Sequence, residues 1–373
     1  MIYLDYTAHA PVEPRALEAF CETETRCIGN ANARHIAGEA TAQVIQDSLN
    51  VCAECLNVRP EELILTSGAS ESNNTAIMGI VHAARHIGRH IITSPLEHAS
   101  VSGCLTALQE RGWEIDMLHV NRQGQIDMEE LRSLLRSDTV LVTLCAVDSE
   151  LGVIQPVEQA AECVRAFPNC RLHMDATQCV GKLPVDFTFA DTVSLSAHKF
   201  GGINGSGFLW KRAGVDMEPL IHGGTSTTLY RSGTPAAGLA ASLSVALQIA
   251  TQARAERFAR VLELNRSLRN ALSARKGVRI HSPQSAIPHI LNIGVDGVRG
   301  AAFRDALSAR GVCVSVKSAC SAENTPSRAV YAVTNNRRQA LESWRISLSH
   351  LTTPEELEEF IGILDLVRKE FQP

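Results

Sequence analysis

The sequence has no excess of basic residues, no long apolar run and few aromatic residues. Its 35 lysines and arginines are outnumbered by 40 aspartates and glutamates, which gives a formal net charge of −5 at pH 7. This balance offers no basic surface for nucleic acid, so we expect no direct nucleic-acid partner. No apolar stretch is long enough to span a bilayer, and residues 1–14 lack the basic start and apolar core of a signal peptide. We therefore expect a cytoplasmic protein with no membrane partner.

The sequence also lacks the repeated cysteine pairs of metal sites. Its 11 cysteines are scattered and odd in number, and a reducing compartment would keep them as thiols. Cys52 and Cys55 form one CxxC pair, but no second pair accompanies it. Cys52 also continues a helical apolar stripe with Ile45 and Leu49, which favours a core position. We expect no metal site.

Strand-like and helix-like segments alternate over the first two-thirds of the chain. The apolar runs that we expect to be strands cover residues 62–68, 90–96, 139–147, 171–176, 192–197 and 205–212. Helical patterns follow several of these runs, which is typical of an α/β protein with a mainly parallel, doubly wound sheet. A long helical pattern over residues 234–275 then leads into a different arrangement of strands and helices.

The length of 373 residues favours two domains. We predict a large domain over residues 15–255. We predict a smaller α+β domain formed by residues 1–14 and 256–373, with strands in "IPHILNIGV" and "SWRISLS". Its last helix is expected to begin at Pro354, because a proline at the first helical position loses no hydrogen-bond donor.

Polar or ionisable side chains follow five of the predicted strands. They lie at residues 67–71, at His98, at residues 148–150, at Asp175 with Gln178, and at residues 196–199. Ligands of open α/β sheets bind beyond the carboxyl ends of the strands, where these groups would meet. Each group alone has an ordinary explanation, such as a surface lysine or a helix-capping histidine. Five at one edge favour a binding site.

The side chains at this edge suit one cofactor in particular. Small residues at 67–70 open a helix, whose N-terminal N–H groups attract phosphate. Lys199 is placed to form a Schiff base with an aldehyde, Asp175 to face a pyridine nitrogen, and His98 to stack on a ring. A phosphate site, a Schiff-base lysine and a pyridinium partner are what pyridoxal 5'-phosphate requires.

The motifs resemble those of the cysteine desulfurases, in the class V aminotransferase group of fold type I pyridoxal-phosphate enzymes. The resemblance covers nearly the whole chain in the family's order. Its segments are "YLDYTAHAPVEPR", "GNANARHIAGE", "LTSGASESNN", "SPLEHASV", "ELGVIQPV", "MDATQCVGKLPVDF", "SLSAHKFGG", "RSGTP", "KSACSAENTPSRAV" and "RISLSHLTTPEELEEF". It implies the fold type I transferase fold and a reaction that converts L-cysteine to L-alanine.

The resemblance also implies a role for individual residues. Lys199 would be the Schiff-base lysine, His98 would stack on the ring and help move protons, and Asp175 would pair with the ring nitrogen. The ring oxygen would contact Gln178, and the substrate carboxylate would bind Arg345, with Asn32 assisting nearby. The phosphate would be held by Ala69, Ser70, Ser196 and His198, and by Thr234 from the neighbouring subunit of a homodimer.

Cys320 decides the subfamily. It lies in a segment rich in small and polar residues, where the family places a cysteine that forms a persulfide. Lys317 and Arg328 are near in sequence and would favour its thiolate form. The implied acceptor is a scaffold or sulfur-carrier protein that serves iron–sulfur cluster or thio-cofactor synthesis. The small domain would carry this cysteine.

The sequence departs from the family pattern near the site. Tyr6, His9 and Ala10 are unusual at the N-terminal motif. The family has two asparagines where this chain has Asp148 and Ser149, so the second asparagine's contact with the cofactor would be weakened or supplied by Ser149.

Other functions remain open at this stage. A transaminase, or a selenocysteine or cysteine lyase, would use Lys199 and Asp175 but would not need Cys320 as a sulfur carrier. A catalytically silent partner protein would keep the fold without the reaction. A nucleotide-binding protein is disfavoured, because "GGINGSG" is not a P-loop.

Overall fold

Helices and strands alternate along the chain, as the computed structural model shows for residues 1–225, 228–317 and 325–371. The strands are β1 (Ile2–Tyr3), β2 (Leu63–Thr66), β3 (His90–Thr93), β4 (Glu114–Met117), β5 (Thr139–Cys145), β6 (Arg171–Asp175), β7 (Thr192–Ser196), β8 (Gly207–Lys211), β9 (Val278–Ile280), β10 (Ile290–Val295), β11 (Val312–Cys313) and β12 (Ser343–Ser347). The helices are α1 (Pro14–Arg26), α2 (Ile36–Leu56), α3 (Ala69–Ala83), α4 (Ala99–Gln109), α5 (Met128–Leu134), α6 (Val157–Arg165), α7 (Ala237–Gln252), α8 (Arg254–Ser273), α9 (Gly300–Ser308), α10 (Arg328–Thr334), α11 (Arg337–Glu342) and α12 (Pro354–Glu370).

A seven-stranded sheet with the order β2-β8-β7-β6-β5-β3-β4 forms the centre of the larger part of the molecule. Strands β3 to β7 pair in parallel, and only β8 runs antiparallel to its neighbours β7 and β2. This confirms the α/β class and the mainly parallel sheet. Because the parallel strands share one direction, their carboxyl ends meet along one edge of the sheet.

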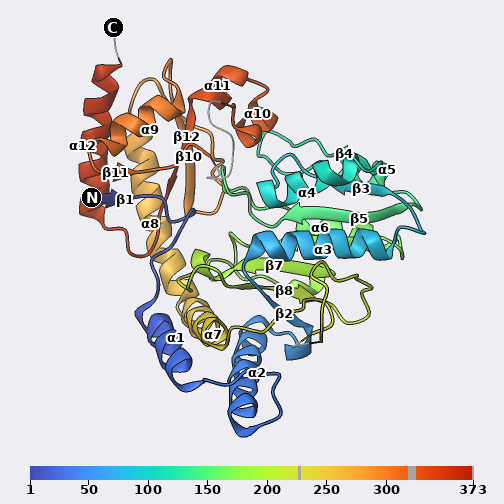
Figure 1. Ribbon diagram of the computed structural model, residues 1–373. Coiled ribbons are helices and arrows are strands. Elements are labelled where there is room, and N and C mark those ends of the chain that lie inside the picture. The colour runs from blue at the N-terminus through green and yellow to red at the C-terminus, as the bar shows by residue number, and fades with distance from the viewer. Residues whose placement is uncertain (226–227, 318–324, 372–373) are drawn as a thin grey trace.

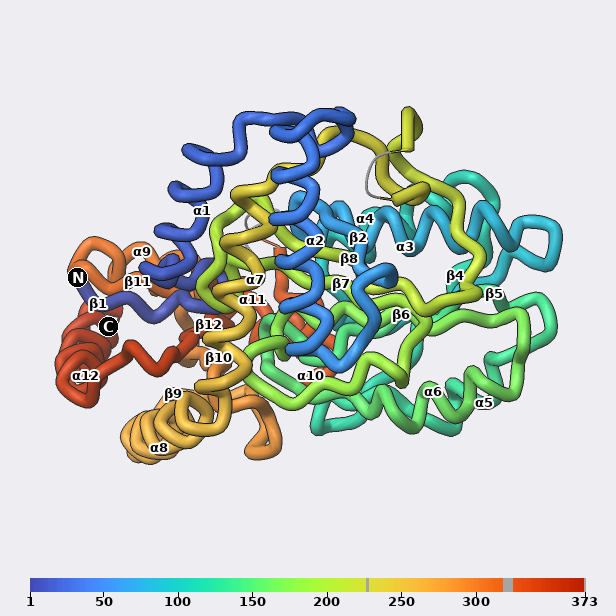
Figure 2. Tube along the Cα trace, turned by 90° about the horizontal axis from the view of Figure 1, so that it is seen from below, coloured from blue at the N-terminus to red at the C-terminus, as the bar shows by residue number. Residues whose placement is uncertain are grey.

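Helices cover both faces of this sheet (Figure 1). Successive residues of a strand point to opposite faces, so Ile91 of β3 packs in a core with Ile77 of α3, while Ile92 packs in another core with Leu243 of α7. On that second face α7 lies between α1 and α2 and contacts both (Figure 2). Cys52 of α2 is fully buried there, as its place in an apolar stripe predicts.

A separate hydrophobic core lies between the three-stranded antiparallel sheet β12-β10-β9 and helices α8, α9 and α12. The N-terminus joins this part, because β1 pairs in parallel with β11 through Ile2 and Val312. Figure 1 shows the N-terminus beside α12 on this side of the molecule. The exact division at residues 14/15 and 255/256 stays a prediction.

The helical pattern over residues 234–275 forms two helices rather than one. Ala253 ends α7 and begins α8, and its φ and ψ of −86° and 1° lie outside the helical range. No glycine or proline marks this break. The reason is tertiary, since α7 packs on the central sheet whereas α8 packs in the smaller core.

The start of α12 is as predicted. Pro354 occupies the first turn, Thr353 Oγ1 accepts a hydrogen bond from the Glu356 N–H, and the Glu356 carboxylate accepts one from the Thr353 N–H. Across the described residues, none of the helices combines the length and the apolar character needed to cross a membrane.

Candidate active site

The carboxyl ends of five strands surround a cavity of about 250 Å³. Ten of the residues predicted from the sequence line it: Ala69, Ser70, His98, Ser149, Asp175, Gln178, Ser196, His198, Lys199 and Arg345. Thr7, Ala8, Leu96, Cys145, Val147 and Thr177 complete the lining. The sheet edge therefore brings together most of the predicted set.

Three predicted residues do not line this cavity. Asn32 is exposed in the segment before α2. Thr234 is also exposed and lines a different hollow, of about 130 Å³, with Ser67 and Arg231. Cys320 lies outside the described residues. Their predicted roles therefore stay predictions.

Asp175 ends β6 and is held in place by two hydrogen bonds. Its Oδ2 accepts from Asn73 Nδ2 at 2.9 Å, and its Oδ1 accepts from the Thr177 N–H at 3.0 Å. The oxygen of the Asn73 amide accepts from His173 Nε2 at 2.9 Å. Burial lowers the pKa of the His173 ring, an effect that the Asp175 charge opposes. A buried carboxylate with a fixed orientation is what a pyridinium nitrogen needs as a partner.

His98 is both the N-cap of α4 and a wall of the cavity. Its Nδ1 accepts from the Ser100 N–H at 3.2 Å and lies 2.8 Å from Ser100 Oγ. This capping role was one explanation open for the residue, and it coexists with a place at the site. With Nδ1 accepting, Nε2 carries the ring proton. Burial lowers the pKa of His98, so the neutral ring is favoured at neutral pH.

The N-terminus of α3 lies where the sequence predicts a phosphate cradle. The Ala69 N–H donates to Ser196 Oγ at 2.7 Å, which joins α3 to the end of β7. Gly68 allows this approach, because its φ is +138° and a Cβ there would lie 3.0 Å from Ser196 Oγ. His198 lines the same end, and its buried Nδ1 has no hydrogen-bond partner among the described residues. A phosphate oxygen would supply the acceptor that this ring lacks.

Lys199 is held by the N-terminal segment of the chain. Its Nζ donates to the carbonyl oxygens of Thr7 and Ala8, at 2.8 and 2.7 Å. In the same segment His9 stacks on His198, with ring centroids 5.7 Å apart. The unusual N-terminal motif thus contacts both the predicted Schiff-base lysine and the phosphate cradle. The motif signalled a departure from the family, but nothing in it signalled these contacts.

Gln178 is fixed by contacts on both ends of its amide. Its Nε2 donates to the Thr7 carbonyl at 3.3 Å, and its Oε1 accepts from Lys182 Nζ at 2.9 Å. Lys182 was not singled out from the sequence. Burial, followed by the charge of Lys199, lowers the pKa of Lys182 to about 7.

Asp148 and Ser149, which stand where the family pattern has two asparagines, make different contacts. Asp148 is buried and accepts hydrogen bonds from the N–H groups of Glu150 and Leu151, so it shapes the loop after β5. Burial raises the pKa of Asp148 to about 7. Ser149 lines the cavity, and its carbonyl oxygen accepts from Arg345 NH1 at 2.8 Å.

Arg345 of β12 reaches the cavity from the smaller core. It is 2% exposed, and its NH2 pairs with Asp5 Oδ1 at 2.9 Å. Its Nε is buried without a partner among the described residues. The guanidinium is therefore oriented by Asp5 and Ser149, with donors remaining for a carboxylate. Asp5 was not predicted, because a residue so far away in sequence carries no local signal.

A third unpredicted group, Glu97, lies just behind His98. Its Oε1 accepts from Ser94 Oγ at 2.7 Å and from the Cys145 N–H at 2.9 Å. Burial raises the pKa of Glu97 to about 8, so this carboxyl is largely protonated at neutral pH. Arg328 donates to the Glu97 carbonyl at 2.6 Å.

The two cations near Cys320 in sequence both contact described residues. Lys317 donates to the Thr325 carbonyl at 3.0 Å, and burial lowers the pKa of its ammonium. Lys317 and Arg328 line a polar cavity of about 250 Å³ that shares Leu96, His98 and Ser149 with the candidate active site. Their effect on the Cys320 thiol stays a prediction.

One group of possible metal ligands lies elsewhere among the described residues. His90, Glu114 and Asp116 bring their ligand atoms within 4.8 Å of one another on β3 and β4. Arg136 already pairs with the Glu114 carboxylate, and His90 Nε2 lies 3.1 Å from Asp116 Oδ2. These pairings already account for the polar atoms of the group.

Comparison with known proteins agrees with this geometry. The family model described as "Aminotransferase class-V" matches residues 2–360. A cysteine desulfurase IscS of Salmonella paratyphi B is 36% identical, over 99% of this chain and 92% of that protein. The solved structure of a NifS-like protein superposes with a TM-score of 0.93 at 30% identity, covering 99% of this chain and all of the other. SspA in complex with cysteine superposes with a TM-score of 0.82 at 29% identity, covering 95% of this chain and all of the other.

Proposed function

The chain belongs to the class-V aminotransferase family and is a pyridoxal-phosphate-dependent cysteine desulfurase, and we propose that it passes the sulfur of L-cysteine to an acceptor through a persulfide on Cys320. The observation that carries this proposal is the cavity at the sheet edge. It combines Lys199, Asp175 and His98 with a phosphate cradle at α3 and with Arg345.

The residues around the cavity fit the cofactor. The unpartnered Nδ1 of His198, the N-terminus of α3 and Ser196 suit its phosphate group. Asp175 suits its ring nitrogen, His98 its ring face, and Gln178 with Ser149 its ring oxygen. When bound, pyridoxal phosphate supplies an electron sink for the carbanion chemistry at the α-carbon of an amino acid.

We assign the remaining steps to this chain's own side chains. Arg345 binds the carboxylate of L-cysteine, and Lys199 Nζ takes the proton from its α-carbon. The Cys320 thiolate forms an S–S bond with the substrate sulfur as the Cβ–S bond of the substrate breaks. The electron pair left on Cβ takes a proton and Lys199 returns one to the α-carbon, so the products are L-alanine and a persulfide on Cys320.

The proposal extends to the assembly and its partners. We infer a cytoplasmic homodimer in which Thr234 of one subunit reaches the phosphate held by the other. Large apolar side chains support an interface, because Ile28 and Ile36 are each 86% exposed. Asn32 is assigned to the substrate side of the site. The acceptor would be a scaffold or sulfur-carrier protein for iron–sulfur cluster or thio-cofactor synthesis.

The test is to supply L-cysteine to the purified protein and to measure alanine and protein-bound sulfane sulfur together. We expect both products in the wild type and neither in Lys199→Ala. Lys276→Ala is the matched control, because Lys276 is exposed and does not line the cavity. Alanine without bound sulfur would favour a lyase, transfer of the amino group to a keto acid would favour a transaminase, and no turnover would favour a silent partner.

A further inference from the structure

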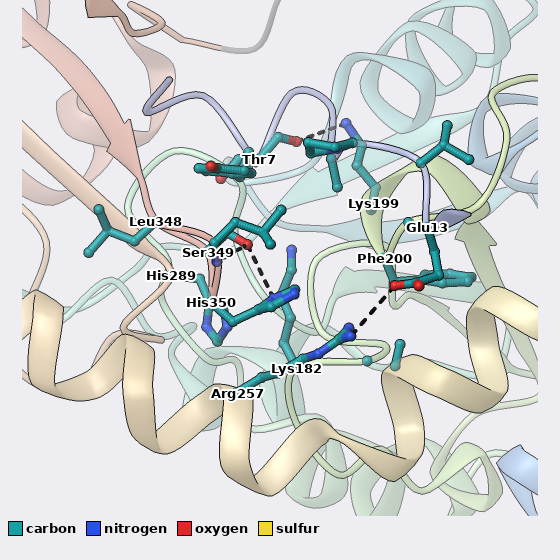
Figure 3. A pocket seen from close by; sticks show the side chains of 18 of the residues that line it. Thr7, Glu13, Lys182, Lys199, Phe200, Arg257, His289, Leu348, Ser349 and His350 are labelled. Atoms are coloured by element: carbon teal, nitrogen blue, oxygen red, sulfur yellow. Dashed lines mark hydrogen bonds and ion pairs between the residues drawn. The ribbon is translucent and has the colours of Figure 1, made fainter. Parts of the chain in front are cut away.

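A second cavity, of about 140 Å³, adjoins the candidate active site and shares Thr7 and Lys199 with it. It lies between the N-terminal segment before α1, the helices α7 and α8, and residues 348–351. Figure 3 shows its lining, with Arg257 rising from α8 toward Glu13. Neither the cofactor nor the reaction described above requires this second cavity.

The lining of the adjoining cavity is strongly cationic. Lys182, Lys199 and Arg257 line it together with one carboxylate, Glu13, which lies 3.8 Å from the Arg257 guanidinium. His289 and His350 add two imidazoles, and Tyr6 adds a phenol. Because the cofactor would engage Lys199 in the loaded protein, Arg257 and the charged form of Lys182 are left against the single acid, and they give the cavity a positive potential.

Several donors in this cavity have no acceptor among the described residues. The Lys182 ammonium has three donors and makes one hydrogen bond, to Gln178 Oε1. His289 is 7% exposed, and its buried Nδ1 has no partner. A buried polar atom without a partner in a native protein calls for an explanation, and a bound ion or water molecule is one of those that apply.

The pKa shifts of the two histidines in this cavity also indicate a cationic environment. Burial, followed by the charges of Lys182 and His350, lowers the pKa of His289. Burial, followed by Arg257 and Arg260, lowers the pKa of His350 to about 4. The nearby cations are Lys182 for the His289 ring, and Arg257 and Arg260 for the His350 ring. An anion in the cavity would balance them.

We propose that the adjoining cavity binds a small oxyanion, through Lys182 and the ring of His289. The ligand carries one carboxylate, sulfate or phosphate group and little else. The cavity has room for only about four or five water molecules at the volume that each takes up in liquid water. Phe200 and Leu348 form apolar walls, which strengthen charged hydrogen bonds by lowering the local dielectric constant.

Binding there would communicate with the active site through two contacts. Lys182 donates to Gln178, which lines the cofactor cavity, and Lys199 lines both cavities. An oxyanion beside them stabilises the charged form of Lys182 and so fixes its hydrogen bond to Gln178. The site does not depend on the desulfurase reaction, so the failure of either proposal would leave the other standing.

The experiment is a titration of the pyridoxal-phosphate-loaded protein with sodium sulfate at constant ionic strength, set by sodium chloride. Loading keeps the cofactor's own phosphate site filled. Binding is followed by calorimetry and by the NMR signals of the His289 ring. We expect saturable binding that shifts these signals, and Lys182→Gln should weaken it at least about tenfold, since a hydrogen bond from a charged group is lost.

Lys369→Gln is the matched control, because it removes the same charge from an exposed position near the end of α12. It should bind sulfate as the wild type does. His289→Gln serves as a second variant should Lys182→Gln fail to fold. An acetate arm distinguishes a carboxylate ligand from an inorganic one by its relative affinity. No saturable binding of either anion, or equal binding by the wild type and the folded variants, would overturn the proposal.

Discussion

Asn73 Nδ2 donates to Asp175 Oδ2 at 2.9 Å, so a residue of α3 orients the carboxylate that ends β6. The two residues lie 102 positions apart in the sequence. Asn73 is fully buried, and its other amide atom is held by His173. The orientation of Asp175 is therefore set before any ligand arrives, which lowers the cost of binding a pyridinium ring.

Asn73→Ala should weaken cofactor binding. Without the amide, the buried Asp175 loses a charge-assisted hydrogen bond, and we expect the dissociation constant of pyridoxal phosphate to rise about tenfold or more. It is measured by titrating cofactor into the apo protein and following tryptophan fluorescence. Asn74→Ala is the control, because Asn74 donates only to the backbone carbonyls of Ser70 and Ser100. Equal affinity in the two variants would contradict the role assigned to Asn73.

Arg345→Lys should raise KM for L-cysteine. Lysine keeps the charge but loses the planar fork, and one charged hydrogen bond of about 1.5–3 kcal/mol corresponds to a rise of about ten- to a hundredfold. Steady-state alanine production gives KM and kcat separately. Arg338→Lys is the control, because Arg338 is exposed on α11. A fall in kcat with an unchanged KM would argue against carboxylate binding by Arg345.

Because His173 is buried, we expect the protein to lose stability in acid. Burial lowers its pKa in the folded protein, so the unfolded chain binds the extra proton as the pH falls below about 6.5. Stability should therefore decrease with falling pH, by up to about 1.4 kcal/mol per pH unit from this group. Urea unfolding of wild type and His173→Gln between pH 7 and pH 5 measures the slope. The variant should have a shallower slope than His86→Gln, which changes an exposed histidine. Equal slopes would exclude His173 as the cause.

Thr234 should act in trans. A heterodimer of one Lys199→Ala subunit and one Thr234→Val subunit would contain one site with a normal Lys199 and a normal Thr234, so it should retain about half of wild-type activity at limiting cofactor. When both substitutions lie in one subunit and its partner is wild type, one site lacks Lys199 and the other lacks Thr234. Neither site is then intact. That arrangement should be the less active of the two. The reverse order would show that Thr234 serves its own subunit.

Local sequence signals were sufficient for most of the fold. The strands that lead to Ala69, His98, Ser149, Asp175 and Ser196 are apolar and end in polar groups, and all five form as predicted. The short strand β4 alternates charged and apolar residues over only four positions and has no buried residue, which explains why it gave no clear signal. The break at Ala253 also has no local signal, because it depends on which core each helix joins.

In the candidate active site, the sequence likewise indicated the motif residues but not the residues that support them. Residues within motifs, such as Lys199 and Gln178, were identified from the order of the motifs along the chain. Their supports came from elsewhere: Thr7 and Ala8 hold Lys199 through backbone carbonyls, which any residue type supplies. Asp5 supports Arg345 from the other end of the chain. Contacts of this kind follow from tertiary packing and leave no pattern in the sequence.

The most direct test of the account is to locate the sulfur. Protein incubated briefly with L-cysteine is alkylated, digested and examined by mass spectrometry for peptides that carry one additional sulfur. We expect the extra sulfur on the Cys320 peptide in the wild type, and its absence from Cys320→Ser, which should bind cofactor normally. Cys313→Ser is the matched control and should keep the modification, because Cys313 lies in β11, seven positions before Cys320. Alanine production with no sulfur on Cys320, or undiminished sulfur transfer by Cys320→Ser, would contradict the account.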